Sequence, residues 1–401
     1  MKALFYNHTG RVSGAERVLL LALAGLDRDQ IQPTVVSPKG DFTREIAGLG
    51  IPWLRIGELN ARFTLRPDKL ISYAVSLMGT VLDLRSRIVD SDPEVIHANS
   101  IRAGIAALLA TYGTKRPVIW HVHDEIKPHP LSTAIRLLAL FSKRCRIVAV
   151  SNATAASFAG RLLKIADVAV LHNAVDLSKI DPIINSRNLK DQLGLSNEDF
   201  LFGIVGQITP RKGQLELIKA FARVADRTPE AKLLIVGAPI FNDDHIYQAT
   251  LADAVQALGL QERILFLGQR SDAIAIIKEI DALIINSRSE AFVMVAIEAM
   301  ACGTPVVATD VGGTREMIEH QYNGLLVDFG DETQLIDAMT TMYADGDLRE
   351  LFKGRSREKV EKRLNAERFF RKFQVILVET TITHPSLRVQ PKLDAGAYEN
   401  R

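Results

Sequence analysis

Two glutamates, Glu290 and Glu298, are spaced so that they could serve chemistry in this chain of 401 residues. Glu290 follows the apolar run DALIINS, and Glu298 lies about two helical turns further on. Carboxylates accept hydrogen bonds from paired hydroxyls, so two at this separation could hold the two sugars of one nucleotide sugar. The backbone N–H groups that would face its diphosphate belong to Ala291, Phe292, Val293 and Met294. Alternatively, Glu290 caps a helix in its first turn and Glu298 lies on the surface, although apolar neighbours argue against a surface position for Glu298.

A basic turn follows the apolar run FLFGIVG. The segment QITPRKGQ places Arg211 and Lys212 at the start of the helical stretch QLELIKAFARV. Two cations beside a helix amino terminus favour a phosphate, and a solvated basic turn is the alternative. Gly206 and Gly237 end the runs FLFGIVG and AKLLIVG, and we assign both to donor binding because ligands of open parallel sheets bind outside the carboxyl ends of the strands.

Polar residues also follow the apolar runs of the first half of the chain. Five of the nine histidines fall there, and each could be a structural residue instead of a functional one. The polar residues are Asn7, His8, His97, Asn99, His121, His123, Asp124, Ser151, Asn152, His172 and Asn173. His121 and His123 are two apart on a strand, which would permit a metal pair, but no third ligand follows at a metal-binding spacing. We therefore expect no metal site.

The first apolar run turns through TGRVSGAER into the helical stretch VLLLALAGL. Gly10 and Gly14 would let the backbone approach a ligand closely, and the helix amino terminus would favour an anion. Only two of the three glycines of the dinucleotide fingerprint are present, and no well-placed acid follows the next strand. A nicotinamide-dependent enzyme is therefore disfavoured.

The elements that must position these residues are short apolar runs separated by amphipathic helical stretches. The runs are KALFYN, PTVVS, EVIHAN, PVIWHVH, RIVAVS, VAVLHN, FLFGIVG, AKLLIVG, RILFLG, DALIINS, PVVATD and GLLVD. This alternation predicts an α/β fold of parallel sheets covered on both faces, with too many strands for one open sheet. We predict two doubly wound Rossmann-like domains.

The domain boundaries follow from the same pattern. We predict an amino-terminal domain at 1–180, a hinge at 181–199 that carries Pro182, and a carboxyl-terminal domain at 200–365. A helix at 366–381 could pack back on the first domain. The tail at 382–401 is expected to be mobile because its proline and charge content cannot bury enough surface to order it.

Composition excludes several classes of protein. Hydrophobic residues make up 47% and charged residues 24%, and no apolar stretch approaches the ~20 residues of a membrane span, so disorder, fibrous repeats and integral membrane proteins are disfavoured. The first residues lack the apolar core of a secretory signal, which predicts a cytoplasmic protein. Cys145 and Cys302 are too few and too far apart for a disulfide framework or a cysteine zinc site.

Charge is distributed unevenly along the chain. Residues 1–180 hold 23 Lys and Arg against 15 Asp and Glu, whereas residues 181–401 hold 26 against 32. The first half could face something anionic, and solvated helix faces are the alternative. The segment 129–146 adds apolar residues at helical spacing (Leu131, Ile135, Leu138, Phe141) and basic residues (Arg136, Lys143, Arg144, Arg146), a pattern compatible with an interfacial helix near an anionic membrane. Core packing is favoured, because Leu137 and Leu140 widen the stripe.

Several of these motifs resemble those of the GT-B retaining glycosyltransferases of family four, also called glycosyltransferase group 1. The run from Glu290 through GTPVVATDVGGTRE to NGLLV resembles the donor site of that family, and ITPRKG resembles its phosphate-binding turn. SGAER resembles the glycine loop, His123 the histidine that ends a central strand, and HNAVD at 172–176 the motif before the hinge. Together these motifs cover most of residues 5–330.

The resemblance implies two Rossmann-like domains that face each other across a cleft. It also implies retaining transfer of a sugar from a nucleotide diphosphate sugar, with neither metal nor cofactor. Glu298 would hold the ribose, Glu290 the hydroxyls of the donor sugar, and Arg211 with Lys212 the leaving diphosphate. His123 would contact the transferred sugar, and Gly14 would let the first domain close over the phosphates.

The implied partners are the nucleotide sugar donor and a glycan, lipid-linked or small-molecule acceptor, in envelope polysaccharide or glycoconjugate synthesis. A peripheral contact with the inner face of the plasma membrane is an open expectation, and no nucleic acid partner is expected.

The chain departs from the family pattern at three positions. Ala291 and Val293 stand where glycines are common, and Gln207 stands where an arginine is usual, with Arg211 as a substitute. Two alternatives use the same scaffold: a sugar-phosphate epimerase or synthase, and a catalytically silent nucleotide-sugar-binding subunit. The Glu290 and Glu298 arrangement argues against the first, and these glutamates together with Lys212 argue against the second.

Overall fold

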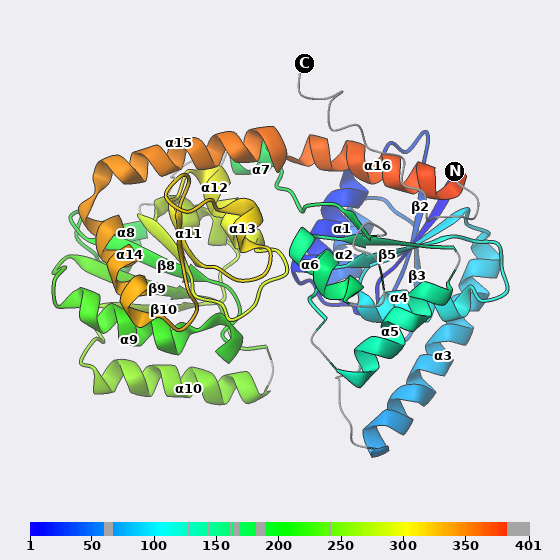
Figure 1. Ribbon diagram of the computed structural model, residues 1–401, viewed down its shortest axis with the longest axis horizontal. Coiled ribbons are helices and arrows are strands. Elements are labelled where there is room, and N and C mark those ends of the chain that lie inside the picture. The colour runs from blue at the N-terminus through cyan, green and yellow to red at the C-terminus, as the bar shows by residue number, and fades with distance from the viewer. Residues whose placement is uncertain are drawn as a thin grey trace. The chain divides into compact units, whose positions relative to one another are not determined.

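The computed structural model describes residues 1–59, 67–126, 129–142, 144–160, 163, 168–181, 189–240 and 242–382. The chain divides into two compact units. The amino-terminal unit consists of Met1–Asn173 and the segment from Glu367 onward, and the carboxyl-terminal unit is Ala174–Ala366 (Figure 1). Each unit is a parallel sheet with helices against it.

The amino-terminal unit contains a seven-stranded sheet in the order β3-β2-β1-β4-β5-β6-β7. Its strands are β1 (Lys2–Tyr6), β2 (Gln32–Ser37), β3 (Trp53–Arg55), β4 (Val95–Ala98), β5 (Val118–Val122), β6 (Cys145–Ala149) and β7 (Val168–Val170). Its helices are α1 (Gly14–Ala24), α2 (Asp41–Gly48), α3 (Pro67–Ser91), α4 (Ile101–Ala110), α5 (Pro130–Phe141), α6 (Asn152–Ala159) and most of α16 (Ala366–Ile382). Tyr6 of β1 pairs with Val36 of β2 on one side and Ala98 of β4 on the other, so the strand order reverses at β1.

The carboxyl-terminal unit contains a six-stranded sheet in the order β10-β9-β8-β11-β12-β13. Its strands are β8 (Phe200–Val205), β9 (Ala231–Val236), β10 (Ile264–Gly268), β11 (Ala282–Ile285), β12 (Val306–Thr309) and β13 (Leu325–Val327). Its helices are α7 (Leu177–Ile180), α8 (Leu189–Leu193), the 3-10 helix η2 (Pro210–Lys212), α9 (Gln214–Ala225), α10 (Asn242–Ala257), α11 (Ala273–Glu279), α12 (Met294–Cys302), α13 (Thr314–Met317), α14 (Glu332–Ala344) and α15 (Gly346–Arg363).

The prediction of two doubly wound parallel sheets is confirmed. Each predicted apolar run contains a strand, and the strands are mostly apolar because helices cover both faces of each sheet. Strand β3 was not predicted, because its three residues Trp53–Arg55 are too few to show a pattern.

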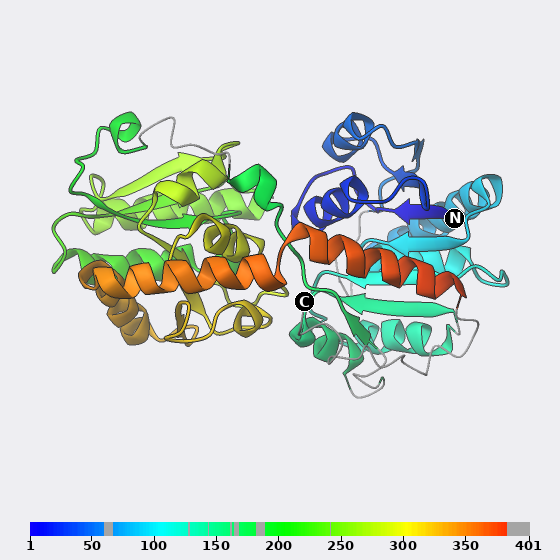
Figure 2. The same cartoon turned by 90° about the horizontal axis from the view of Figure 1, so that it is seen from above.

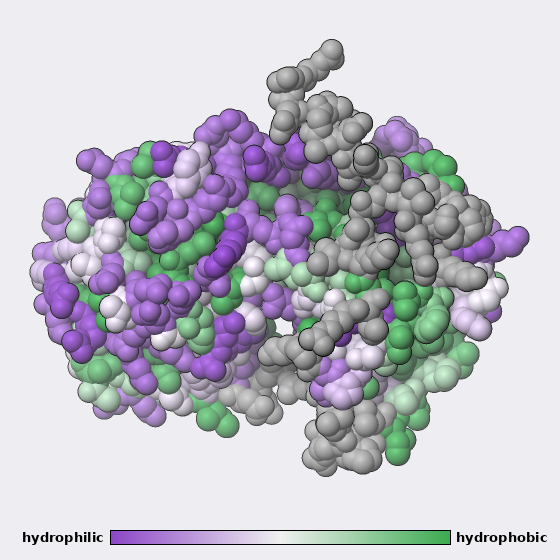
Figure 3. Space-filling view, viewed as in Figure 1, coloured by the Kyte–Doolittle hydropathy of each residue, from purple (hydrophilic) through white to green (hydrophobic). Residues whose placement is uncertain are grey.

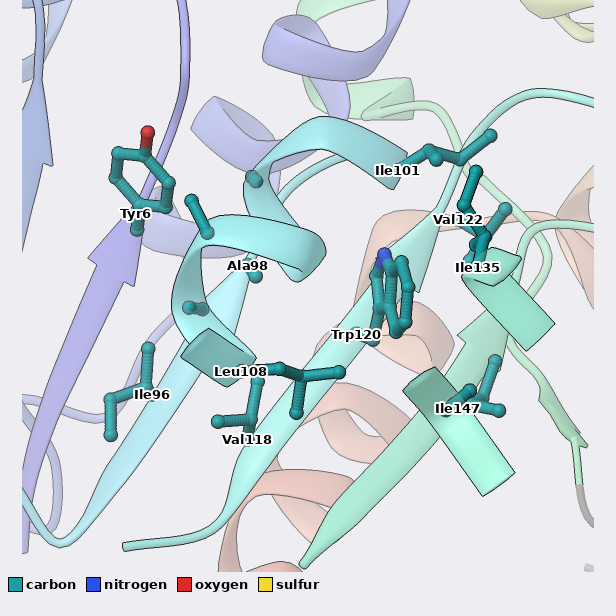
Figure 4. Packing of buried hydrophobic residues seen from close by; sticks show 14 of the residues in the cluster. Tyr6, Ile96, Ala98, Ile101, Leu108, Val118, Trp120, Val122, Ile135 and Ile147 are labelled. Carbon is teal, nitrogen blue, oxygen red and sulfur yellow. The ribbon is translucent and has the colours of Figure 1, made fainter. Parts of the chain in front are cut away.

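Buried side chains fix the carboxyl edge of the first sheet. Trp120 of β5 is fully buried, packs edge-on against Phe158 at 5.3 Å between ring centroids, and lies among aliphatic side chains (Figure 4). Its indole Nε1 donates to the carbonyl of Ser100 at 3.0 Å. A Cβ on Gly104 would lie 1.9 Å from that nitrogen, so only glycine lets α4 pack this closely. The start of α4, beside the strand ends, is thereby held in place.

Helix α16 packs on the sheet of the amino-terminal unit (Figure 2). The ring of Phe373 lies 6.3 Å from that of Phe5 and 5.3 Å from that of His97. Arg146 of β6 donates to the carboxylate of Glu379 at 3.0 Å. In the predicted hinge at 181–199, residues 182–188 lie outside the described residues, and 189–199 include a short helix at Leu189–Leu193. In the predicted tail, residues 383–401 lie outside the described residues.

Helix α5 uses most of the stripe proposed for a membrane to pack on its own sheet. Ile135 is buried and Leu138 packs against the core, although Phe141 is exposed. Arg136 donates to the carbonyls of Phe158 and Ser157 at 2.8 and 2.9 Å, and Arg146 lies in β6 rather than on the helix. Core packing therefore accounts for Ile135 and Leu138 of this segment, and the contact with a membrane stays a prediction. Within the described ranges, no helix has the length and apolar character needed to cross a membrane.

Candidate active site

The basic turn after β8 is locked to the end of β11. Gly213 lies between η2 and α9 with φ of 66°, and a Cβ there would be 2.1 Å from the carbonyl oxygen of Asn286. The side chain of Asn286 in turn donates to the carbonyl of Gly213 at 2.9 Å. Glycine is required here both for the left-handed backbone and for the close approach. The turn therefore carries Arg211 and Lys212 to the loop that holds Glu290.

Glu290 is the buried centre of this site. Its side chain is 8% exposed, Lys212 Nζ donates to Oε1 at 2.6 Å, and Arg211 Nη1 lies 3.2 Å from the same oxygen. Burial alone would raise the pKa of Glu290, but the charges of Lys212 and then Arg211 outweigh it, so the pKa is lowered. Glu290 is therefore ionised at neutral pH.

Backbone contacts hold the same loop from two sides. Arg211 Nη1 donates to the carbonyl of Ser289 at 2.9 Å, and the N–H of Arg288 donates to the carbonyl of Arg211 at 2.8 Å. From the other side, the N–H of Gly313 donates to the carbonyl of Glu290 at 3.0 Å. Gly313 of the GTPVVATDVGGTRE run thus supports the loop through the backbone.

Helix α12 begins at Met294, four residues after Glu290. Glu290 therefore cannot be an acid in its first turn, and the helix-capping alternative is wrong. Phe292 and Val293 are buried in the approach to the helix, and Ala291 is half-buried. Glu298 lies in the second turn and is half-buried, so it is not a fully exposed surface residue.

Gly206 and Gly237 meet at the ends of β8 and β9. Their φ angles are 147° and 140°, and a Cβ on Gly237 would be 1.8 Å from the carbonyl oxygen of Gly206. The two glycines allow a close backbone approach between the strand ends. Their part in donor binding stays a prediction.

The side chain of Gln207 is hydrogen-bonded to another residue of the carboxyl-terminal unit. Its side-chain amide donates to the carboxylate of Asp244 at 2.7 Å. Arg211, by contrast, lies beside Lys212 and Glu290, where it could meet a phosphate. Sequence reasoning did not foresee Asn286 or Asp244; the end of the DALIINS run was the one signal for Asn286.

In the amino-terminal unit, His123 follows β5 and is oriented by Asn99. His123 Nε2 lies 2.9 Å from Asn99 Oδ1. Asn99 Nδ2 donates to the carbonyl of Ala15 at 3.3 Å and to Asn7 Oδ1 at 3.2 Å. Because a carbonyl can only accept, the amide nitrogen must face Ala15 and Oδ1 must face His123. His123 therefore carries its proton on Nε2, which leaves Nδ1 as an acceptor.

His97 and His121 belong to the core behind His123. Both are buried in strands, and His97 Nε2 lies 3.2 Å from His121 Nδ1. Burial lowers the pKa of His97 and His123 to about 3, and it also lowers that of His121, so all three are neutral at physiological pH. Among the described residues, no group of three or more His, Cys, Asp or Glu is placed to hold a metal ion.

The glycine loop before α1 contains Gly10 and Gly14, which have different surroundings. Gly14 is the exposed first residue of α1, and the preceding Ser13 donates its N–H to Glu16 at 3.0 Å. A Cβ on Gly10 would be 2.5 Å from the carbonyl oxygen of Lys39, so Gly10 is needed for a contact within the chain. Gly10 therefore has a packing role within the chain, and the approach of Gly10 and Gly14 to a ligand stays a prediction.

Two family models match the chain in succession. "Glycosyltransferase Family 4" matches residues 12–179, and "Glycosyl transferases group 1" matches residues 185–359. The two parallel, doubly wound sheets form the GT-B fold of glycosyltransferases. The chain belongs to the group 1 glycosyltransferases of family 4.

Individual relatives extend the comparison. The UDP-Gal:alpha-D-GlcNAc-diphosphoundecaprenol alpha-1,3-galactosyltransferase of Escherichia coli is 25% identical over 67% of this chain and 71% of that protein. The N-acetyl-alpha-D-glucosaminyl L-malate synthase of Bacillus anthracis is 28% identical over about half of each chain (52% and 53%). Anabaena Alr3699/HepE, solved in complex with UDP-glucose, is 27% identical with a TM-score of 0.80, over 94% of this chain and all of that one.

Proposed function

We propose that this glycosyltransferase transfers a sugar from a nucleotide diphosphate sugar with retention of anomeric configuration and without a metal ion. The observation that carries the proposal is the convergence of Lys212 and Arg211 on Glu290 beside the ends of β8 and β11. UDP is the favoured nucleotide, because HepE was solved with UDP and with UDP-glucose and the E. coli relative is named for UDP-Gal.

The two cations would meet the leaving diphosphate. Breaking the bond to the anomeric carbon builds negative charge on the diphosphate, and preorganised cations lower the barrier to that step. Lys212 is held by Glu290 and Arg211 by the carbonyl of Ser289, so neither must reorganise during transfer. This supply of positive charge is the basis for proposing a metal-independent reaction.

The remaining roles are proposed from the resemblance and the site. Glu290 would accept hydroxyls of the donor sugar, and Glu298 would accept the ribose hydroxyls. His123, whose Nδ1 is an acceptor, would contact the transferred sugar. We propose a glycan or lipid-linked acceptor in envelope glycoconjugate synthesis at the cytoplasmic face of the membrane, supported by the diphosphoundecaprenol acceptor in the name of the E. coli relative.

The first test is a thermal-shift series with UDP, GDP, ADP, UDP-glucose and UDP-galactose. A nucleotide at ~100 times its dissociation constant adds ~2.7 kcal/mol to stability. We expect the uridine compounds to raise the melting temperature most, in EDTA as in buffer. If none of the five shifts the transition, the chain does not bind such donors and the proposal fails.

Turnover tests the catalytic step. Lys212→Ala should lower kcat for donor hydrolysis or transfer by about 10²-fold to 10³-fold, since its charge matters most as the diphosphate leaves. Lys219→Ala, on the exposed face of α9, is the matched control and should be unchanged. Proton NMR of the product should show the anomeric configuration of the donor; an inverted product would refute retention.

A further inference from the structure

Helix α3 exposes a stripe of large apolar side chains on one face. Ile71, Val75, Met78, Leu82 and Val89 are each between 60% and 68% exposed, and no other helix in the described part of the chain exposes as many. The stripe forms part of the apolar surface over α3 in Figure 3. The opposite face is used by the unit itself: Val81, Leu84 and Ile88 are buried, and α3 packs against α4.

The spacing of the stripe is that of a coiled-coil seam. Steps of four and three residues alternate from Ile71 through Val75 and Met78 to Leu82, and continue through Arg85 to Val89. This alternation is the 3.5-residue repeat with which one helix pairs with another. An interfacial membrane helix instead carries Lys and Arg along a broad apolar face. The sequence from Ile71 to Leu82, ISYAVSLMGTVL, contains no charged residue, so the pattern favours a helical partner.

The area of the stripe suits a second copy of the same chain. Each aliphatic side chain would bury about 100 Å², judged from the free energy of burying such a group. Tyr112, which is 83% exposed, lies beside the stripe, because Arg85 Nη1 donates to its carbonyl at 2.9 Å. The five aliphatic side chains and Tyr112 would together bury about 600 Å² of surface per copy. A pair would bury about 1,200 Å², which reaches the lower limit of stable interfaces. We propose that α3 pairs with α3 of a second copy to form a two-fold dimer.

The charge at Arg85 determines the direction of pairing. Parallel helices would place Arg85 against its own copy, in an apolar seam where like charges repel. An antiparallel pair places Ile71 opposite Val89, Val75 opposite Arg85, and Met78 opposite Leu82. The guanidinium of Arg85 already donates to the carbonyls of Ala110 and Tyr112, so only its aliphatic stem need cover the partner's valine. The two-fold axis then passes close to Gly79.

Gly79 provides a test that does not damage the fold. A Cβ at Gly79 meets no atom within 4 Å, and replacing a glycine inside a helix favours the helix. Gly79→Glu should therefore fold as a monomer and place two carboxylates near each other across the axis. Gly79→Ala is the matched variant without charge. Ile246→Glu, at an apolar side chain that is 71% exposed on α10, is the control for surface charge.

Sedimentation equilibrium between 1 and 100 µM distinguishes the outcomes. We expect the wild type, Gly79→Ala and Ile246→Glu to approach twice the chain mass of 44.2 kDa. Gly79→Glu should raise the dimer dissociation constant at least tenfold. A wild type that stays monomeric at 100 µM overturns the proposal, and so does a dimer that Gly79→Glu leaves intact.

Vesicle flotation tests whether a membrane, rather than a second copy of the chain, covers the stripe. Binding of a monomeric wild type to phosphatidylglycerol vesicles, lost in Gly79→Glu, would assign the stripe to a membrane and overturn the dimer. The inference is independent of the proposed function. The uridine nucleotide thermal shift should be the same in Gly79→Glu and wild type, so failure of either proposal can be recognised separately.

Discussion

Lys212 Nζ lies 2.6 Å from Glu290 Oε1, so the cation proposed for the phosphate and the carboxylate proposed for the sugar stabilise each other. The two residues lie 78 positions apart in the sequence. Both are largely buried, with 15% and 8% of their side chains exposed. A buried charge left without its partner is costly, so the pair couples the fold of the site to its chemistry.

The ion pair should appear as a coupling energy in a double-mutant cycle. Lys212→Met leaves Glu290 with Arg211 alone and should cost about 2–4 kcal/mol in the free energy of unfolding. Glu290→Gln leaves Lys212 uncompensated, and the double variant should cost less than the sum of the two. Far-UV circular dichroism in urea measures the cycle. Trp53 and Trp120 both lie in the amino-terminal unit, so a tryptophan fluorescence transition that does not move would locate the effect in the carboxyl-terminal unit.

The pH dependence of the same variants has a defined sign. Because the pKa of Glu290 is lowered in the folded protein, its contribution to stability is full above the unfolded pKa of about 4.3 and is lost as the pH falls through the folded value. The stability difference between wild type and Glu290→Gln should therefore shrink between pH 5 and pH 3. Additive single variants, or a difference that grows in acid, would contradict the coupling.

Substitutions at the two glutamates should have different effects on the affinities for UDP and UDP-glucose. UDP contains the ribose but no transferred sugar, so Glu298→Gln should weaken UDP and UDP-glucose alike, by about 10-fold to 100-fold for a lost charge-assisted hydrogen bond pair. Glu290→Gln should weaken UDP-glucose more than UDP, because only UDP-glucose carries the transferred sugar. Isothermal titration calorimetry measures both. Equal affinity of wild type and Glu298→Gln for UDP would remove Glu298 from the ribose site.

The sequence predicted the sheets because their signal is local. Each of the apolar runs predicted to be a strand contains one, and β3 was missed because Trp53–Arg55 offers no such run. The alternative that Glu290 lies in the first turn of a helix could not be dismissed from the sequence, since nothing local distinguishes a loop held by Lys212 and Gly313 from a first helical turn. The ends of helices and strands depend on contacts with residues that are distant in the sequence.

The candidate site was predictable in residue types but not in partners. The basic turn and Glu290 were singled out separately, and their ion pair joins positions that only the sheet brings together. Asn99 was noted as a polar residue at a strand end, but its control of the proton on His123 depends on the carbonyl of Ala15. Likewise, the apolar stripe of α5 could not be assigned to the core or to a surface until its neighbours were known.

Gly237 should be among the least replaceable residues of the carboxyl-terminal unit. Gly237→Ala would bring a Cβ to 1.8 Å from the carbonyl oxygen of Gly206 at a φ of 140°, and should cost about 3–5 kcal/mol. Gly259→Ala is the matched control, because Gly259 also has a positive φ of 67° but has no atom within 4 Å of an added Cβ. It should cost about 1–2 kcal/mol. Equal losses in thermal unfolding would show that backbone strain, not the contact with Gly206, determines the effect.

The buried histidines should make the amino-terminal unit sensitive to acid. Burial lowers the pKa of His8 to about 4 and that of His97 and His123 to about 3, and the pKa of His121 is lowered as well. The unfolded chain binds protons at these side chains near pH 6.5, whereas the folded unit does not. Stability is therefore full above pH 6.5 and falls as the pH drops, by about 2 kcal/mol per histidine between pH 7 and pH 5.

The four together would remove about 6–8 kcal/mol, which is comparable to the whole stability of a typical domain. Urea unfolding followed by tryptophan fluorescence at pH 7, 6 and 5 reports this unit, since Trp53 and Trp120 both lie in it. His97→Gln removes one titrating group and should reduce the loss by about a quarter, even if the variant starts less stable at pH 7. A fluorescence transition that does not move between pH 7 and pH 5 would mean that these histidines are protonated in the folded unit, and the neutral acceptor assigned to His123 would then be untenable.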